Sequence, residues 1–137
     1  MKKSIVIVGK KSFVASSLYK YLNSKFKVRN IDFKSLIKKK EKFFKRNDLI
    51  INCSSNKNYI FKKYNSKYDF DYQIVKKIEK FKTKFIFLST RKVYKLKSNI
   101  KENDKILPKC NYSINKYITE KKITKILDKK VLILRIQ

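Results

Sequence analysis

The residues best suited to chemistry in this sequence are a tyrosine and a lysine four positions apart, Tyr112 and Lys116. This spacing places both side chains on one face of a helix, with Glu120 one turn further along. An ammonium beside a phenol lowers the tyrosine pKa from about 10, and each unit is worth roughly 1.4 kcal/mol. The pair therefore predicts a tyrosine that can act as a general acid or base.

The need for such a tyrosine follows from the composition, because the chain has no histidine. Ser-His-Asp and Cys-His nucleophiles and His-ligated metals are excluded. The two cysteines, Cys53 and Cys110, form neither a CxxC pair nor a disulfide framework, which favours a reducing compartment. No apolar run is long enough to span a membrane. The apolar stretch near the start of the chain is followed by lysines too early to form the hydrophobic region of a signal peptide. We expect a soluble, cytoplasmic protein with no membrane partner.

Spacing alone does not single out one tyrosine. With 9 tyrosines and lysine at roughly a quarter of positions, about two Tyr-x-x-x-Lys pairs are expected by chance. The chain has five such pairs, beginning at Tyr21, Tyr59, Tyr72, Tyr112 and Tyr117. The surrounding sequence must therefore decide which pair, if any, belongs to a site.

The net charge of +28, from 38 Lys+Arg and 10 Asp+Glu, is typical of a nucleic-acid-binding surface. Arginine binds phosphates and base edges better than lysine, because its planar guanidinium can donate two parallel hydrogen bonds. The chain nevertheless has only four arginines, Arg29, Arg46, Arg91 and Arg135. It is also poor in alanine, glycine and proline and rich in lysine, asparagine, isoleucine and tyrosine, as in AT-rich genomes. We interpret the charge mainly as such a composition, which disfavours nucleic acid, and keep binding of nucleic acid through residues 38–46 as an alternative.

Hydrophobic patterning predicts an alternation of strands and helices. Short apolar runs predict strands at 4–8, 27–33, 48–52, 85–89 and 131–136. Apolar residues at helical spacing predict helices over 12–23, 34–46, 71–81 and 112–128, with loops at 53–69 and 90–111. This order predicts one Rossmann-like α/β domain over 1–137, a doubly wound parallel sheet covered on both faces, with strand order 3-2-1-4-5. Ligands of such sheets bind at the carboxyl ends of the strands, where the order reverses between the first and fourth.

Two of these strand ends carry features of a dinucleotide site. Gly9, the only glycine, follows the first strand and precedes a helix whose N-terminus suits a pyrophosphate. The dinucleotide fingerprint has further glycines where this chain has Ser12 and Ala15, so a plain strand-to-helix turn is the alternative. Asp32 ends the second strand, where a carboxylate binds a ribose 2′-OH and favours NAD over NADP. Its alternative role is to cap the next helix.

Three segments carry a family resemblance. Residues 85–94 (FIFLSTRKVY) precede the residues Glu102, Pro108, Tyr112, Lys116 and Glu120. This arrangement resembles the extended short-chain dehydrogenase/reductase family, which includes nucleotide-sugar epimerases, dehydratases and 4-dehydrorhamnose reductases. Residues 48–54 (DLIINCS) resemble the family's third cofactor strand, and residues 9–15 (GKKSFVA) resemble its glycine-rich loop. The resemblance spans nearly the whole chain and is strongest from 85 to 120.

The resemblance implies roles for particular residues. Tyr112 would be the catalytic acid/base, Lys116 would bind the nicotinamide ribose and tune Tyr112, and Thr90 would bond the substrate. The implied cofactor is NAD rather than NADP, in a site lined by Gly9, Ser12, Phe13, Val14, Asp32, Cys53, Ser54, Ser89 and Lys116. The alternative for Cys53 is a small buried hydrophobic residue rather than a nucleophile.

The implied function is that of an NAD-dependent nucleotide-sugar epimerase, dehydratase or reductase, or of its N-terminal cofactor-binding part. The implied partners are a nucleotide-sugar substrate and, because relatives often pair through helices near the Tyr-x-x-x-Lys motif, a second copy of the chain. Family members continue past the position of Gln137 through a further strand and a substrate-binding region. We therefore expect a chain truncated before that region, and a relative that folds but is catalytically inactive is the alternative.

Overall fold

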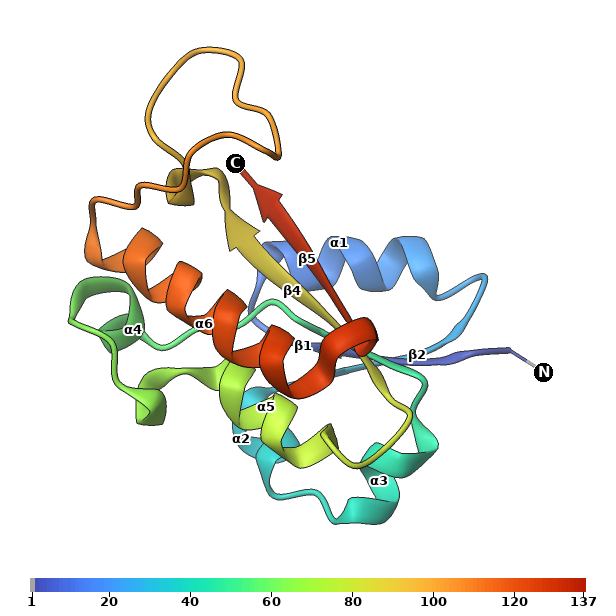
Figure 1. The fold of residues 1–137 in the computed structure, drawn as a ribbon. Coiled ribbons are helices and arrows are strands. Elements are labelled where there is room, and N and C mark those ends of the chain that lie inside the picture. The colour runs from blue at the N-terminus through green and yellow to red at the C-terminus, as the bar shows by residue number, and fades with distance from the viewer. Residues whose placement is uncertain (1) are drawn as a thin grey trace.

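The computed structural model describes residues 2–137 and contains one five-stranded parallel sheet (Figure 1). The strands are β1 (Ser4–Val8), β2 (Lys27–Ile31), β3 (Leu49–Asn52), β4 (Lys84–Thr90) and β5 (Val131–Ile136). The helices are α1 (Phe13–Leu22), α2 (Phe33–Ile37), α3 (Glu41–Arg46), α4 (Lys57–Phe61), α5 (Phe70–Ile78) and α6 (Asn111–Leu127). Short 3₁₀ turns lie at Ser66–Tyr68, Arg91–Val93 and Asp128–Lys130.

The predicted α/β class with a doubly wound parallel sheet is confirmed, and the position of the third strand is corrected. The order is β2-β1-β3-β4-β5, so that β3 lies between β1 and β4. This is the six-stranded Rossmann order without the edge strand beyond β2. The reason is local: the chain leaves β2 directly into α2 and α3, and has no strand there to extend that edge. The order therefore reverses between β1 and β3.

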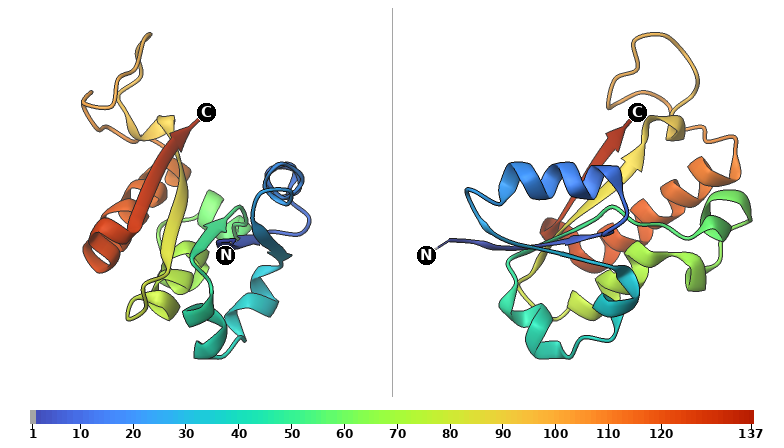
Figure 2. Two further views of the ribbon diagram at one scale, coloured as in Figure 1. Left: turned by 90° about the vertical axis from the view of Figure 1, so that its right-hand side faces the viewer. Right: turned by 180° about the vertical axis from the view of Figure 1, so that it is seen from behind.

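Two apolar clusters hold the helices on the sheet. On one face, α1 alone packs through Ala15 against Ile5, Ile7 and Ile51. On the other face, α2, α3, α5 and α6 share a larger core with the sheet, which includes Leu36, Phe44, Ile74, Phe85, Phe87 and Ile123. Figure 2 shows α1 on the opposite side of the sheet from α2, α3, α5 and α6. The strand order reverses between β1 and β3, and α1 therefore lies on a different face of the sheet from α2, α3, α5 and α6. The N-terminus of α1 follows the carboxyl end of β1.

The predicted helix over 34–46 is wrong in one respect, since it is two helices with a break at 38–40. A continuous helix would place Lys34, Lys38 and Lys42 one turn apart, and like charges at that spacing destabilise a helix. Both pieces still bury their apolar residues, Leu36 from α2 and Phe44 from α3. The amphipathic pattern therefore reports the buried face correctly but not the helix boundary.

The predicted loop over 53–69 is also wrong, because it contains α4 and a 3₁₀ turn. The Tyr59 hydroxyl shares a hydrogen bond of 2.7 Å with Thr119 Oγ1, and Asn115 Nδ2 donates to the Tyr59 carbonyl at 2.7 Å. Both partners lie on α6, far away in the sequence. Polar tertiary bonds, rather than hydrophobic periodicity, hold this segment in place.

No helix within residues 2–137 has both the length and the apolar character needed to cross a bilayer.

Candidate functional site

The turn after β1 has the backbone conformation that the lone glycine predicts. Gly9 has φ of +126°, a region that side chains rarely tolerate. A Cβ built there would lie 3.3 Å from Ser12 Cβ and 3.4 Å from the Cys53 carbonyl carbon. The turn is therefore closed against the end of β3, and it leads directly into the N-terminus of α1.

The turn after β3 is fixed by one buried amide, that of Asn52. Its Oδ1 accepts hydrogen bonds from Ser54 N at 3.0 Å and Ser54 Oγ at 2.8 Å. Its Nδ2 donates to the Ser54 carbonyl at 3.0 Å and to Asp71 Oδ1 at 2.8 Å. The Asn52 side chain therefore sets the position of Cys53 and Ser54 beside the Gly9 turn and links them to α5.

A cavity of about 370 Å³ opens at this edge of the sheet, and we call it the carboxyl-edge cavity. Seven residues assigned by the sequence line it: Val14, Cys53, Ser54, Ser89, Thr90, Tyr112 and Lys116. Of the five Tyr-x-x-x-Lys pairs, which all lie in the described part of the chain, only Tyr112 and Lys116 line this cavity. The fold therefore brings that pair to the neighbourhood of the Gly9 turn.

Lys116 is buried at the floor of the site. Its side chain is 7 % exposed, and its Nζ donates to the Leu88 carbonyl at 2.8 Å. The ammonium lies 4.7 Å from the centre of the Phe87 ring and 5.7 Å from that of Tyr112. Aromatic faces and a carbonyl therefore hold the cation in place and compensate for its lost hydration.

The expected lowering of the Tyr112 pKa is not found. Burial, followed by the charges of Asp71 and Cys110, raises the pKa of the Tyr112 phenol. The physical reason is that desolvation penalises the phenolate, while Lys116 directs its ammonium to the Leu88 carbonyl. The phenol is therefore held protonated, which suits a proton donor better than a resting base.

Two polar residues at the end of β4 have different surroundings. Thr90 Oγ1 accepts a hydrogen bond of 3.2 Å from Lys92 N, and its hydroxyl proton is free to reach a ligand in the cavity. Ser89 also lines the cavity, but its Oγ donates to Glu120. Of these two hydroxyls, the Ser89 proton is already donated within the described part of the protein, whereas the Thr90 proton is not.

Gly9, Ser12, Phe13 and Asp32 do not line the carboxyl-edge cavity. Ser12 caps α1, with Oγ accepting from Ala15 N at 3.3 Å, and Phe13 is 85 % exposed. Asp32 caps α2: its two oxygens accept from Ser35 N and Ser35 Oγ, each at 2.9 Å, and these bonds lower the pKa of Asp32. The structure therefore shows the capping role given as an alternative for Asp32, and each carboxylate oxygen keeps a further lone pair.

Cys53 has the properties of a structural thiol. Burial, with the charge of Asp71, raises the pKa of Cys53 to about 11. A thiol with such a pKa is almost entirely protonated at neutral pH and is a poor nucleophile. The residue therefore contributes shape to the cavity rather than reactivity.

Sequence reasoning missed one important residue, Asp71. This carboxylate lines the cavity from α5, is 4 % exposed, and accepts the hydrogen bond from Asn52. Burial raises the pKa of Asp71 to about 7, although the Lys116 charge and the Asn52 hydrogen bond act in the opposite direction. No local signal identifies it, because an aspartate at the start of a predicted helix is usually an exposed cap.

Asp71 makes a pH-dependent contribution to stability. Its pKa is about 7 in the folded chain, above the ordinary aspartate value of 3.8, so the folded state binds the proton more tightly. Stability is then lost as pH rises from about 4 to 7. We expect Asp71→Asn, which keeps a hydrogen-bond acceptor for Asn52, to be more stable than wild type at pH 8 by up to roughly 4 kcal/mol and to lose this advantage at pH 4. Urea denaturation at both pH values measures the difference.

The control is Glu79→Gln, which neutralises an exposed carboxylate. This variant should change stability little at either pH. If Asp71→Asn follows the control, with no gain at pH 8, the buried carboxylate does not have the assigned properties.

An ion-pair network around the buried Glu120 is linked to the cavity through Ser89. Glu120 is 3 % exposed and accepts hydrogen bonds from Arg135 Nε at 3.0 Å and Nη2 at 2.7 Å. Arg135 Nη1 donates to the Tyr94 hydroxyl at 2.6 Å, and that hydroxyl donates to the Glu102 carbonyl at 3.2 Å. Together with Ser89, these residues join α6, the ends of β4 and β5, and the irregular segment after β4.

A scan against protein-family models and a search of curated proteins each found no match. Among solved structures, the fold is similar to a dTDP-4-dehydrorhamnose reductase of Clostridium acetobutylicum, at 22% identity and a TM-score of 0.75, over 96% of this chain and 52% of that one. The fold is also similar to the dTDP-4-dehydrorhamnose reductase of Bacillus anthracis in complex with NADP, at 18% identity and a TM-score of 0.79. This match covers 98% of this chain and 53% of that one.

A third similar structure is the UDP-glucuronic acid 4-epimerase of Bacillus cereus in complex with NAD, at 18% identity and a TM-score of 0.73, over 96% of this chain and 56% of that one. The chain thus spans about half the length of these enzymes. The matches agree in fold with the family resemblance of the sequence. The chain has the fold of the Rossmann part of extended short-chain dehydrogenase/reductases.

Proposed function

We propose that this chain binds NAD at the carboxyl-edge cavity and serves as the cofactor-binding part of a nucleotide-sugar epimerase, dehydratase or reductase. The observation that carries the proposal is the shared cavity of Val14, Ser54, Tyr112 and Lys116 beside the positive-φ turn at Gly9. These residues come from α1, the end of β3 and α6, which are separate in sequence. Their meeting at the winding reversal of the sheet is where such folds bind ligands.

The residues present fit the pyrophosphate of a dinucleotide. The tight Gly9 turn lets the chain enter α1 close to the end of β3. The first turn of a helix leaves N–H groups without intrahelical acceptors, here those of Phe13 and Val14. These donors and the positive end of the α1 dipole attract an anion. Ser12 Oγ already accepts from Ala15 N, so the two preceding N–H groups would do the binding.

The Asp32 carboxylate supports NAD over NADP. Both of its oxygens accept hydrogen bonds from Ser35, and each keeps a further lone pair for a ribose hydroxyl. The lowered pKa of Asp32 keeps the group ionised. A 2′-phosphate placed at the same position would meet this negative charge.

Three side chains would handle the substrate. NAD, when bound, would accept a hydride from the substrate and return it. Tyr112 would donate or accept the proton of the reacting hydroxyl, Lys116 would hold a ribose hydroxyl after leaving the Leu88 carbonyl, and Thr90 would bond the substrate. Burial favours protonated Tyr112, so the proton donor is ready in the resting site.

The proposed substrate is a nucleotide sugar, as the names of the similar enzymes indicate. The chain matches about half of those enzymes, so residues outside it would complete the sugar site. A second copy of the chain and a cytoplasmic location remain part of the proposal through the family resemblance. The second candidate is a relative that folds but is catalytically inactive.

Calorimetric titration with NAD and with NADP tests the proposal. We expect saturable binding of NAD at one site per chain, and weaker binding of NADP because of Asp32. An absence of saturable binding for both dinucleotides would contradict it.

A further inference from the structure

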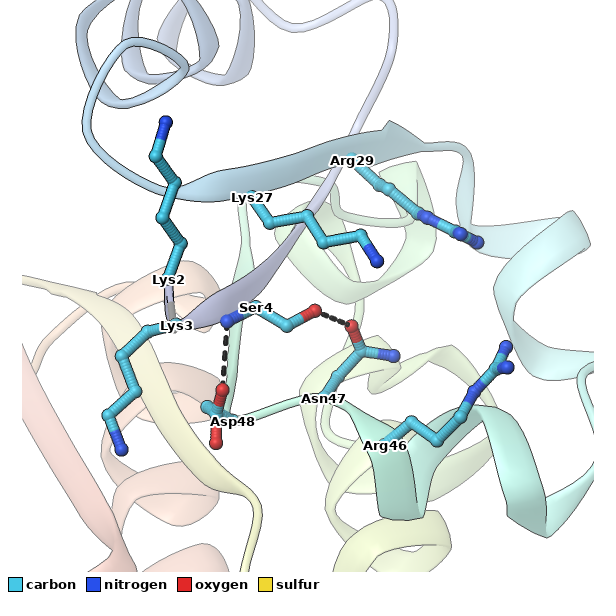
Figure 3. A pocket seen from close by; sticks show the side chains of 8 residues that line it. All are labelled: Lys2, Lys3, Ser4, Lys27, Arg29, Arg46, Asn47 and Asp48. Atoms are coloured by element: carbon cyan, nitrogen blue, oxygen red, sulfur yellow. Dashed lines mark hydrogen bonds between the residues drawn. The ribbon is translucent and has the colours of Figure 1, made fainter.

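A second cavity lies at the opposite edge of the sheet, and we call it the basic cavity. Its volume is about 630 Å³, and it is lined by Lys2, Lys3, Ser4, Lys27, Arg29, Arg46, Asn47 and Asp48 (Figure 3). These residues belong to the amino ends of β1, β2 and β3 and to the end of α3. In a parallel sheet the amino and carboxyl ends of the strands lie at opposite edges. The basic cavity is therefore separate from the candidate NAD site.

The lining has five cationic side chains against one carboxylate. That carboxylate, Asp48, uses Oδ2 to accept the Ser4 backbone N–H at 2.8 Å. Within residues 2–137, the ion pairs involve other cations, at Lys76, Lys80, Lys97 and Arg135. The positive charge of the basic cavity is thus not balanced by protein carboxylates.

The floor of the basic cavity is built from fixed polar groups. Ser4 Oγ donates to Asn47 Oδ1 at 2.6 Å, and Asn47 Nδ2 donates to the Phe43 carbonyl at 2.6 Å. Asn47 is 7 % exposed, so its amide is held in one orientation. In Figure 3 the heads of Lys27, Arg29 and Arg46 lie on the same side as the Asn47 amide nitrogen, whereas Lys2 and Lys3 point away.

The kind of cation distinguishes this cavity from the general lysine excess. The chain has only four arginines, and two of them, Arg29 and Arg46, are among the eight residues of this lining. Arg46 ends α3, where a cation also suits the helix dipole. Arg29 lies in the edge strand β2 and has no such role. Guanidinium groups bind phosphate oxygens in pairs, with a geometry that lysine cannot reproduce.

We propose that the basic cavity binds a small ligand carrying two or more linked phosphates, with Arg29 and Arg46 as paired forks and Lys27 and the Asn47 amide as further donors. Its volume lies in the range of small-molecule sites. Linked phosphates supply several negative charges within the span of three converging cations. An extended nucleic acid would instead use lysines spread over the whole surface.

Calorimetry with inorganic tripolyphosphate on the full chain, at about 150 mM ionic strength, tests this inference. We expect one site per chain, and a loss of affinity of about tenfold or more in the double variant Arg29→Gln/Arg46→Gln. The variant Arg29→Lys/Arg46→Lys keeps the charge and should fall between it and wild type. The matched control is Lys20→Gln/Lys125→Gln, which removes two charges from α1 and α6 and should change affinity by about twofold or less.

Three results would overturn the inference: no saturable binding of tripolyphosphate, equal losses in the arginine variant and the lysine control, or binding only of a single-stranded oligonucleotide with a steep salt dependence. Circular dichroism checks that the variants fold, and all four substituted residues are exposed. NAD titration of Arg29→Gln/Arg46→Gln separates this site from the candidate NAD site. NAD binding should be retained in that variant, and its loss together with tripolyphosphate binding would count against a separate basic cavity.

Discussion

Glu120→Ala is expected to destabilise the chain by roughly 2–4 kcal/mol. The substitution removes the partner of a guanidinium that donates to both Glu120 oxygens, at 3.0 and 2.7 Å. Breaking a buried ion pair costs about 3–5 kcal/mol, because the remaining charge stays desolvated. The Arg135 side chain is 25 % exposed, so some solvation is recovered. Chemical denaturation measures the loss.

The effect should depend on Arg135 and on burial. Glu79→Ala, which breaks an exposed pair of 3.0 Å with Lys76, is the control and should cost less than about 1 kcal/mol. Glu120→Ala/Arg135→Ala should lose less than the sum of the two single variants, since no unpaired charge remains. A Glu120→Ala variant as stable as Glu79→Ala would show that the network does not hold α6 to β5.

Under the proposed function, and with the residues that complete the sugar site present, Tyr112→Phe is expected to lower turnover of a nucleotide sugar by about 100-fold or more, because the phenol proton is lost. The phenyl ring keeps its place above Lys116, whose Nζ lies 5.7 Å from the ring centre, so folding and NAD binding should be retained. The raised pKa of Tyr112 also predicts the direction of the pH dependence: steps that need the phenolate should accelerate as pH rises. Chromatographic separation of substrate and product sugars, with dTDP- and UDP-sugars as substrates, measures the rate.

The matched control is Tyr117→Phe, the same substitution in the next Tyr-x-x-x-Lys pair of α6, whose tyrosine does not line the cavity. This variant should retain the wild-type rate. Equal rates for wild type and Tyr112→Phe would remove the acid/base role. A wild-type chain that binds NAD without any turnover would instead support the inactive relative.

The strands and their carboxyl ends were predictable from sequence because each apolar run is short and bounded by polar residues. Gly9 was informative for the same reason, since a lone glycine in a glycine-poor chain indicates a positive φ, here +126°. The resemblance of residues 85–120 singled out one Tyr-x-x-x-Lys pair from five, and that pair lines the cavity. Local pattern and motif order therefore indicated the place of the candidate site.

Features that depend on packing between distant elements were not predictable. The position of β3 between β1 and β4 depends on the missing edge strand, and α4 depends on hydrogen bonds to Thr119 and Asn115. The burial of Asp71 and the raised pKa of Tyr112 arise only when α5 and α6 close over the sheet. The effect of burial on the Tyr112 pKa is larger than that of the nearby Lys116 charge, and the extent of burial cannot be judged from the sequence alone.

The most direct measurement is calorimetric titration of NAD into wild type, Val14→Asp and Ser17→Asp. Both substitutions place a carboxylate on α1, but only Val14 lines the carboxyl-edge cavity. A carboxylate in the first turn favours the helix, so Val14→Asp should fold while repelling an anionic dinucleotide. We predict saturable binding to wild type, a loss of about tenfold or more in Val14→Asp, and near wild-type binding in Ser17→Asp. Equal affinities for the two variants, or no binding to wild type, would contradict the proposed NAD site.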